Sequence, residues 1–239
     1  MRCSRNKRRN YLVKAVILLS GGLDSTVCMA CAKEAGYELY PISFDYHQRH
    51  NIELESAKKV AAFYQVAKHI VIETNMNVIG GSALTDTSID VPDGDIKSDE
   101  IPVTYVPARN LIFLSYALSY AEAIGAERIL IGVNALDYSG YPDCRPAFIE
   151  QFQQVANYAT KAAAVDKKEI LIETPLLNLS KKEIVELGTK LGAPLHVSHS
   201  CYRGGEKACG VCDSCQLRLK GFREAGIVDP VPYETDDCK

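Results

Sequence analysis

AVILLSGGLDS, residues 15–25, joins an apolar run to a pair of glycines and then to the start of a helix pattern. The apolar run 15–19 is typical of a buried strand, and the glycines after it predict a tight turn. Two adjacent glycines allow backbone N–H groups to approach an anion, and a helix that follows directs the positive end of its dipole to the same point. Because Ser20 and Ser25 add two hydroxyl donors, the stretch predicts a phosphate-binding loop at the end of a first strand.

This loop is not of the common type that holds a γ-phosphate. It lacks the lysine of the G-x-x-x-x-G-K-[ST] pattern, and no Gly-Lys pair occurs anywhere in the chain. It resembles instead the S-G-G-x-D-S loop of enzymes that split ATP between its α and β phosphates. The alternative is a tight turn without a ligand, for which one glycine is sufficient. The residues predicted to bind ATP are Leu19, Ser20, Gly21, Gly22, Leu23, Asp24, Ser25, Thr26 and Phe44.

The length and composition are typical of a globular protein of one domain, or of one domain with a small appendage. The chain has 239 residues, of which 47% are hydrophobic and 24% charged, and its net charge is −3. No apolar stretch approaches the roughly 18 residues of a membrane span. We therefore expect a cytoplasmic protein that does not bind a membrane. Since disulfides are rare in that compartment, its nine cysteines, an odd number, are not expected to be paired.

The chain begins with five basic side chains within residues 2–9. They predict either a nucleic-acid-binding arm or, as we expect, a disordered and dispensable extension over 1–12. A signal peptide is excluded because Lys14 interrupts the apolar run that follows. An ATP-binding α/β domain is expected over 13–195, and a helical zinc-binding segment over 196–239.

Apolar runs of strand length alternate with helix-length patterns along the chain, which predicts a doubly wound parallel sheet of five strands. A polar stretch at 75–101 breaks this alternation and predicts a lid, a mobile insertion or a solvated loop without a role. A capping box at Ser180–Glu183 begins a further helix, which stops at Gly192. The expected strands are 14–19, 38–44, 69–73, 128–133 and 169–173, and the other helices are 23–36, 52–67, 108–124 and 146–165.

Four cysteines near the end of the chain have metal-ligand spacing. Cys201, Cys209, Cys212 and Cys215 form the pattern Cys-x7-Cys-x2-Cys-x2-Cys, in which two-residue gaps present neighbouring thiolates to one tetrahedral ion. Structural zinc, one ion per chain, is the prediction. An iron–sulfur cluster and a redox pair of cysteines are the alternatives, but no second cluster motif is present, and a third equally spaced cysteine argues against a pair.

Polar clusters follow the second and fourth expected strands, at 43–50 and 134–145, and a third opens the buried helix near residue 109. Carboxyl ends of parallel strands meet at one edge of a sheet, so these clusters should converge beside the phosphate loop. They mix aromatic rings, carboxylates and guanidinium groups, which suits a planar, hydrogen-bonding, anionic substrate. The alternative for single members such as Asp137 or Arg109 is a helix cap or a surface ion pair.

The phosphate loop, the polar clusters and the cysteine motif together closely resemble the sequence motifs of the 7-cyano-7-deazaguanine synthase family. That family makes the nitrile precursor of the modified tRNA base queuosine. The resemblance extends from about Val13 to Asp229 and rests on the loop at 20–25 and on SFDYHQRH (43–50), YVPARN (105–110), GVNALDYSGYPDCRPAF (132–148) and SCYRGGEKACGVCDSCQLR (200–218). Residues 1–12 are not required by the family pattern. The resemblance implies that 7-carboxy-7-deazaguanine, ammonia and ATP are the substrates.

We assign roles in such a reaction as follows. The loop binds the ATP phosphates with Mg²⁺, Arg109 and Arg145 neutralise the carboxylate or adenylate charge, and Asp137 and Asp143 contact the guanine-like edge or a metal. Tyr46 or Tyr138 stacks on the base. The expected catalytic residues are Asp24, Arg109, Asp137 and Arg145, and the substrate-binding residues are Tyr46, Arg109, Asn110, Asp137, Tyr138 and Asp143.

Two other functions compete with this interpretation. A tRNA-modifying adenylating enzyme with the same loop would need a basic surface, which a pI of about 6.0 does not favour. A zinc-ribbon nucleic-acid-binding module would leave the phosphate loop without a role. We therefore expect small-molecule substrates, no direct nucleic-acid partner, and a homodimer.

Overall fold

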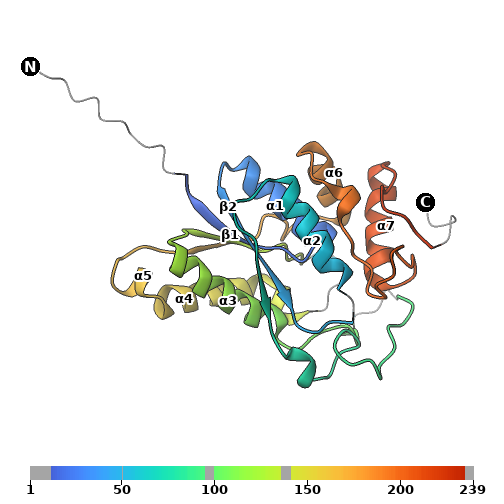
Figure 1. Cartoon of the computed structure of the whole chain (residues 1–239), viewed down its shortest axis with the longest axis horizontal. Helices are drawn as coiled ribbons and strands as arrows, with labels where there is room; N and C mark the ends of the chain where they lie inside the picture. Colours follow the sequence, from blue (N-terminus) through green and yellow to red (C-terminus); the bar gives the residue numbers. More distant parts are fainter. Residues whose placement is uncertain (1–11, 50, 95–99, 136–140, 235–239) are drawn as a thin grey trace, which may run out of the picture.

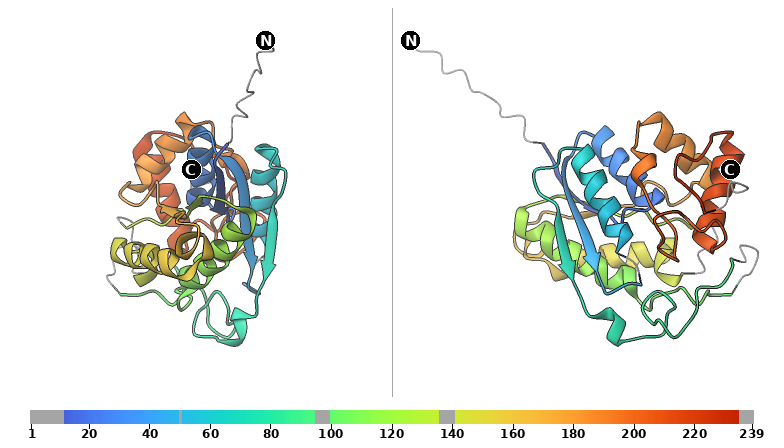
Figure 2. Two further views of the ribbon diagram at one scale, coloured as in Figure 1. Left: turned by 90° about the vertical axis from the view of Figure 1, so that its left-hand side faces the viewer. Right: turned by 45° about the vertical axis from the view of Figure 1, so that its right-hand side comes forward.

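The computed structural model describes residues 12–49, 51–94, 100–135 and 141–234, and its centre is a five-stranded parallel sheet in the order β3-β2-β1-β4-β5 (Figures 1 and 2). In β1, Ile17 lies opposite Pro41 of β2 on one side and Leu130 of β4 on the other. The strands are β1 (Lys14–Leu18), β2 (Glu38–Asp45), β3 (Ile70–Glu73), β4 (Arg128–Leu130) and β5 (Leu171–Glu173). The predicted fold class is confirmed.

Helices cover both faces of the sheet because the side chains of β1 point alternately to opposite sides. Ala15 and Ile17 pack with the helices α1 (Leu23–Glu34), α2 (Ile52–Phe63) and α6 (Lys181–Lys190). Val16 and Leu18 pack on the other face with α3 (Arg109–Ile124) and α4 (Pro146–Ala159). Figure 1 shows these two layers, with α7 (Asp213–Ala225) beside α6. In the described ranges, no helix is both long and apolar enough to cross a bilayer.

The order of the strands reverses between β1 and β4, which makes this the topological switch point of the sheet. Open α/β sheets bind their ligands outside the carboxyl ends of the strands at such a point. The predicted phosphate loop leaves β1 there, and Ile131–Asn134 leave β4 beside it. The topology therefore places both segments at one candidate site.

Several expected boundaries are confirmed, and others are wrong: the fourth strand, expected over 128–133, ends at Leu130, and two helices also differ. Helix α1 ends before Gly36 and α3 before Gly125, and the capping box of α6 is present. The helix expected over 52–67 ends at Phe63, with Gln65 at a φ of 52°. The helix expected over 146–165 breaks at Thr160, whose extended backbone separates α4 from the short α5 (Lys161–Ala164), while its hydroxyl donates to the carbonyl of Ala156.

The stretch expected as a polar loop at 75–101 packs on the C-terminal segment over its described part, after the short helix η1 (Met76–Val78). Val91 is buried beside the cysteine cluster, and the N–H of Gly94 donates to the carbonyl of Val211 at 2.8 Å. The guanidinium of Arg203 donates to Asp93. A lid or mobile function stays a prediction, as do the proposed domain boundaries. Two further short helices are η2 (Pro142–Cys144) and η3 (Leu195–Val197).

Candidate active site and metal centre

The two glycines of the phosphate loop are packed differently. Gly21 has a φ of +94°, and a Cβ on it would lie 2.2 Å from the carbonyl oxygen of Glu53 and 2.6 Å from the nitrogen of Ala57. It is therefore needed for the close approach of α2 to the loop. A Cβ on Gly22 would meet only ordinary van der Waals contacts, the nearest at 3.5 Å, so the packing around this position does not require a glycine.

The serine hydroxyls shape the turn. The N–H of Gly21 donates to Ser25 Oγ at 3.1 Å, and that hydroxyl lies 3.1 Å from Ser20 Oγ. Ser20 Oγ in turn accepts from the N–H of Gly22. Thr26 is completely buried and donates to the carbonyl of Gly22. Gly21 and Thr26 therefore support the loop from behind, whereas the other residues predicted to bind ATP line the cavity described below.

Asp24, in the first turn of α1, is held by a lysine that the sequence analysis did not assign to the site. Lys181 Nζ lies 2.9 Å from both carboxylate oxygens of Asp24, and the lysine is only 9% exposed. Gly221 of α7 allows this packing, since a Cβ there would lie 2.5 Å from Lys181 Cγ. A positive charge thus stands beside the loop even though the loop itself contains no lysine. The available signal was that Lys181 directly follows the cap of α6 at the same end of the sheet.

A cavity of about 280 Å³ opens at the switch point, between the loop and the ends of β2 and β4. One wall is aromatic, with Phe44 and Phe113 stacked at a centroid distance of 3.9 Å and an interplanar angle of 3°. Gly132 lines the cavity beside the loop, where a Cβ would come within 3.1 Å of the backbone of Asp24. A flat apolar wall next to an anion-binding loop is suited to a nucleotide.

Arg109, at the start of α3, is the main positive charge on the other side of this cavity. Its guanidinium lies 3.5 Å from the hydroxyl of Tyr46, and Tyr141 and Tyr202 are its other close neighbours. Burial raises the pKa of the Tyr46 phenol, although the charge of Arg109 opposes that shift. Because Arg109 stays cationic and faces polar rings, it can bind a carboxylate or a phosphate.

Glu53 also lines this part of the cavity and was not assigned by the sequence analysis. It lies in the first turn of α2, and Arg109 and Cys201 line the same cavity. Burial raises the pKa of its carboxyl to about 7, although the charges of Arg109 and His199 lower it. The only signal in the sequence was its place shortly after the polar cluster at 43–50.

Not every predicted catalytic or substrate-binding residue reaches the cavity. Tyr46, Arg109 and Asn110 line it. Asp143 instead accepts the backbone N–H of Asn110 at 2.8 Å and so holds the start of α3. Arg145 is exposed at the start of α4, outside the cavity lining. Direct substrate contacts for these two residues are thus not supported by their positions, and Asp137 and Tyr138 lie outside the described residues.

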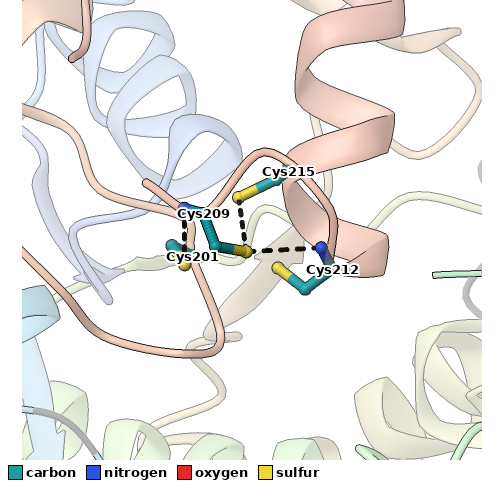
Figure 3. A group of neighbouring side chains, drawn as sticks. All are labelled: Cys201, Cys209, Cys212 and Cys215. Atoms are coloured by element: carbon teal, nitrogen blue, oxygen red, sulfur yellow. Dashed lines mark hydrogen bonds between the residues drawn. The ribbon is translucent and has the colours of Figure 1, made fainter. Parts of the chain in front are cut away.

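The four predicted cysteines form one cluster (Figure 3). They are buried, and their sulfur atoms all lie within 4.8 Å of one another. Backbone N–H groups point at the sulfurs. The N–H of Cys209 donates to the sulfur of Cys201, and the N–H of Cys212 donates to the sulfur of Cys209, each at 3.4 Å. The pKa of the Cys201 thiol is lowered by hydrogen bonds from Cys212 and Cys215. Four sulfurs this close can all be thiolates only with a cation between them, and the cluster is compatible with one structural metal ion.

The segment that carries this cluster is hydrogen-bonded directly to the phosphate loop. Helix α1 has no cap from its own N-cap residue, and the N–H of Leu23 donates instead to Ser200 Oγ at 3.2 Å. The N–H of His199 donates to the carbonyl of Gly21 at 2.9 Å. Arg218 of α7 donates to both Ser200 and Ser198, so the cysteine segment, α7 and the loop form one connected unit.

A phosphate loop at the switch point of a doubly wound parallel sheet defines a nucleotide-binding α/β protein. The family model described as queuosine biosynthesis protein QueC matches residues 14–226, and the chain belongs to this family. The predicted family and the prediction of an enzyme are therefore confirmed.

Named relatives agree with this assignment. A 7-cyano-7-deazaguanine synthase of Desulfitobacterium hafniense is 63% identical over 220 residues, which cover 92% of this chain and 93% of that one. The protein of the same name from Acetivibrio thermocellus is 61% identical over 221 residues, covering 92% and 97% of the two chains. Among solved structures, NMN synthetase from Francisella tularensis aligns with a TM-score of 0.48 at 18% identity, over 91% of this chain and 79% of that chain.

Proposed function

We propose that this chain converts 7-carboxy-7-deazaguanine and ammonia into 7-cyano-7-deazaguanine at the expense of ATP. The observation that carries the proposal is one cavity in which an SGGLDS loop, an aromatic wall and the half-buried Arg109 meet. Membership of the QueC family and the shared name of the relatives support the same reaction.

The chemistry follows from the poor reactivity of a carboxylate. Its oxygen attacks the α-phosphate of ATP, which gives an acyl-adenylate and releases pyrophosphate. Ammonia then displaces AMP to give an amide, and loss of the amide oxygen after a second activation by ATP gives the nitrile. The absence of a γ-phosphate-type lysine from the loop favours this cleavage between the α and β phosphates.

Each part of the site has a task in this sequence. The loop and Lys181 stabilise the charge of the leaving pyrophosphate, and Phe44 with Phe113 provides the surface for the adenine. Arg109 binds the substrate carboxylate, and Tyr46 contacts the base beside it. Free ammonia is the nitrogen donor, and the active molecule is a homodimer.

Two metal ions complete the proposal. Zinc suits the buried Cys201, Cys209, Cys212 and Cys215 because four thiolates in a closed cluster are typical of structural zinc sites. It would hold the C-terminal segment against the loop and take no part in the chemistry. Mg²⁺ would accompany ATP, and Asp24 offers the carboxylate oxygens that this ion prefers.

The test is to incubate the protein with ATP, ammonium and 7-carboxy-7-deazaguanine, and to separate the products by chromatography and mass spectrometry. We expect the nitrile, AMP and pyrophosphate, and no reaction when tRNA replaces the deazaguanine acid. ADP and phosphate as the only nucleotide products would overturn the adenylation route. Reaction with tRNA but not with the acid would refute the proposed substrate.

A further inference from the structure

Glu53 is a cavity-lining acid for which the described residues provide no partner. Asp24, another acid in the lining, is paired with Lys181. Within the described part of the chain, the carboxylate of Glu53 accepts no hydrogen bond and forms no ion pair. A half-buried carboxylate left in this way is costly unless a ligand pairs with it.

The position of Glu53 relative to the reacting groups is fixed from two sides. Its backbone carbonyl packs against Gly21, where even a single Cβ would come within 2.2 Å. Its side chain lines the cavity that Arg109 also lines. Glu53 therefore stands directly beside the loop proposed to hold the phosphates, in the cavity that it shares with the guanidinium proposed to hold the substrate carboxylate.

We propose that Glu53 binds ammonium and accepts a proton from it. The ammonia formed in this way can then attack the acyl-adenylate. This inference rests on the proposed function, because it names the residue that serves its second substrate. Ammonium is small and cationic, so it fits an unpaired carboxylate next to the carbon that will be attacked. Arg49 and Arg109 also line the cavity, but a cationic guanidinium can neither bind ammonium nor accept its proton.

The step balances in atoms and charge. Ammonium gives one proton to the carboxylate of Glu53, and the nitrogen lone pair of the resulting ammonia attacks the acyl carbon of the adenylate. A C–N bond forms, the C–O bond to AMP breaks, and the nitrogen loses a second proton to water. The products are the amide, AMP and two protons, and Glu53 returns its proton to water before the next turnover.

A different role for Glu53 would be recognition of the guanine-like edge, whose N–H groups also suit a carboxylate. That edge lies at the far end of the ring system from the carboxyl group, whereas Glu53 lines the same cavity as Arg109, the proposed carboxylate-binding residue. The two roles make opposite predictions for the amide intermediate, because the amide keeps the guanine edge but no longer needs ammonia.

The experiment compares the wild type with Glu53→Gln in three reactions. The first uses ATP, the acid and ammonium. The second replaces ammonium by hydroxylamine, a neutral nucleophile at pH 7 that traps the adenylate as a hydroxamate. The third supplies the amide with ATP and follows the nitrile. The matched control is Glu55→Gln, which removes an exposed carboxylate two residues away on α2 that is paired with Lys58.

We expect Glu53→Gln to lower kcat/KM for ammonium by about 10- to 150-fold, the range for loss of a hydrogen bond to a charged group. Hydroxamate formation and conversion of the amide should stay close to wild type, and Glu55→Gln should change none of the three reactions. Glu53→Asp keeps the charge and should retain part of the ammonium reaction, which provides a second variant should Gln at this position impair folding.

Three results would overturn the inference. An unchanged ammonium reaction removes any role for the carboxylate. Equal losses with hydroxylamine and ammonium assign Glu53 to adenylation, and a slow amide reaction assigns it to the guanine edge. If the wild type forms neither hydroxamate nor nitrile, the proposed function fails instead, so the two failures are distinguishable.

Discussion

Replacing Gly21 by alanine should separate the phosphate loop from α2, and the structure provides a matched control for the backbone cost. Gly21 has a φ of +94°, and a Cβ there would overlap the backbone of Glu53 and Ala57 at 2.2 and 2.6 Å. Gly36, at the other end of α1, has a φ of +76° but no atom within 4 Å of its Cβ position. Gly36→Ala therefore bears only the backbone cost, about 1–2 kcal/mol. Gly21→Ala adds the steric overlap with α2, which should destabilise the protein by about 1–3 kcal/mol more, because the overlapping atoms belong to the backbone and cannot move aside as a flexible side chain would.

Urea denaturation of the two variants measures this difference, and calorimetric titration with ATP measures its consequence for the loop. We expect the free energy of unfolding of Gly21→Ala to lie about 1–3 kcal/mol below that of Gly36→Ala. ATP binding should be lost in the first variant and kept in the second. Equal stabilities together with normal ATP binding by Gly21→Ala would refute the inference that close packing on α2 sets the loop.

Three further predictions concern the cysteines and the connection between the C-terminal segment and the loop. Cys212→Ser should release the metal and lower both the midpoint of thermal unfolding and the activity, since the apparent binding free energy of structural zinc is about 10–16 kcal/mol in small peptides. Iron with acid-labile sulfide in the wild type, or a metal-free active enzyme, would contradict this prediction. Ser200→Ala leaves the N–H of Leu23 without its acceptor, at about 1–3 kcal/mol, and should raise the KM for ATP while the metal content stays constant; a drop in metal content would assign Ser200 to the cluster instead. Burial raises the pKa of Cys144 to about 11, so its thiolate fraction should rise about tenfold per pH unit from pH 7 towards that value. The rate of its alkylation by iodoacetamide, mapped by mass spectrometry, should rise in the same way. Rapid labelling that levels off near pH 8 would instead show an activated thiol.

The sequence was sufficient for the features that depend on local spacing. Short apolar runs separated by helix-length patterns predicted the parallel sheet, and the cysteine spacing predicted a cluster that the fold closes. Glycines at the ends of α1 and α3 marked their termini because both adopt positive φ. In each case the signal is a local spacing of residues, even where the strands that pair, such as β1 and β4, are distant in the sequence.

The residues that the sequence analysis missed or misplaced depend on distant partners. Lys181 meets Asp24 across 157 positions, and Ser200 meets Leu23 across 177. No local pattern carries such pairings. Asp143 depends on a distant partner too: it stands in a polar cluster beside the site, yet its carboxylate accepts a hydrogen bond from the backbone N–H of Asn110, 33 positions away. A polar residue near a strand end thus predicts the neighbourhood of a site better than it predicts contact with the ligand.

The same distant contacts bear on the boundary expected at residue 195. His199 donates to the carbonyl of Gly21 from beyond that boundary, and the buried Arg218 is paired with Asp229 at 2.7 Å while it donates to Ser198. Removing the segment after residue 195 would therefore leave loop groups without partners at the place where the phosphates should bind. A metal that takes no part in the chemistry can still be essential for it, because it fixes the segment that holds the loop in shape. The cysteine cluster is better understood as a support of the active site than as a separate module.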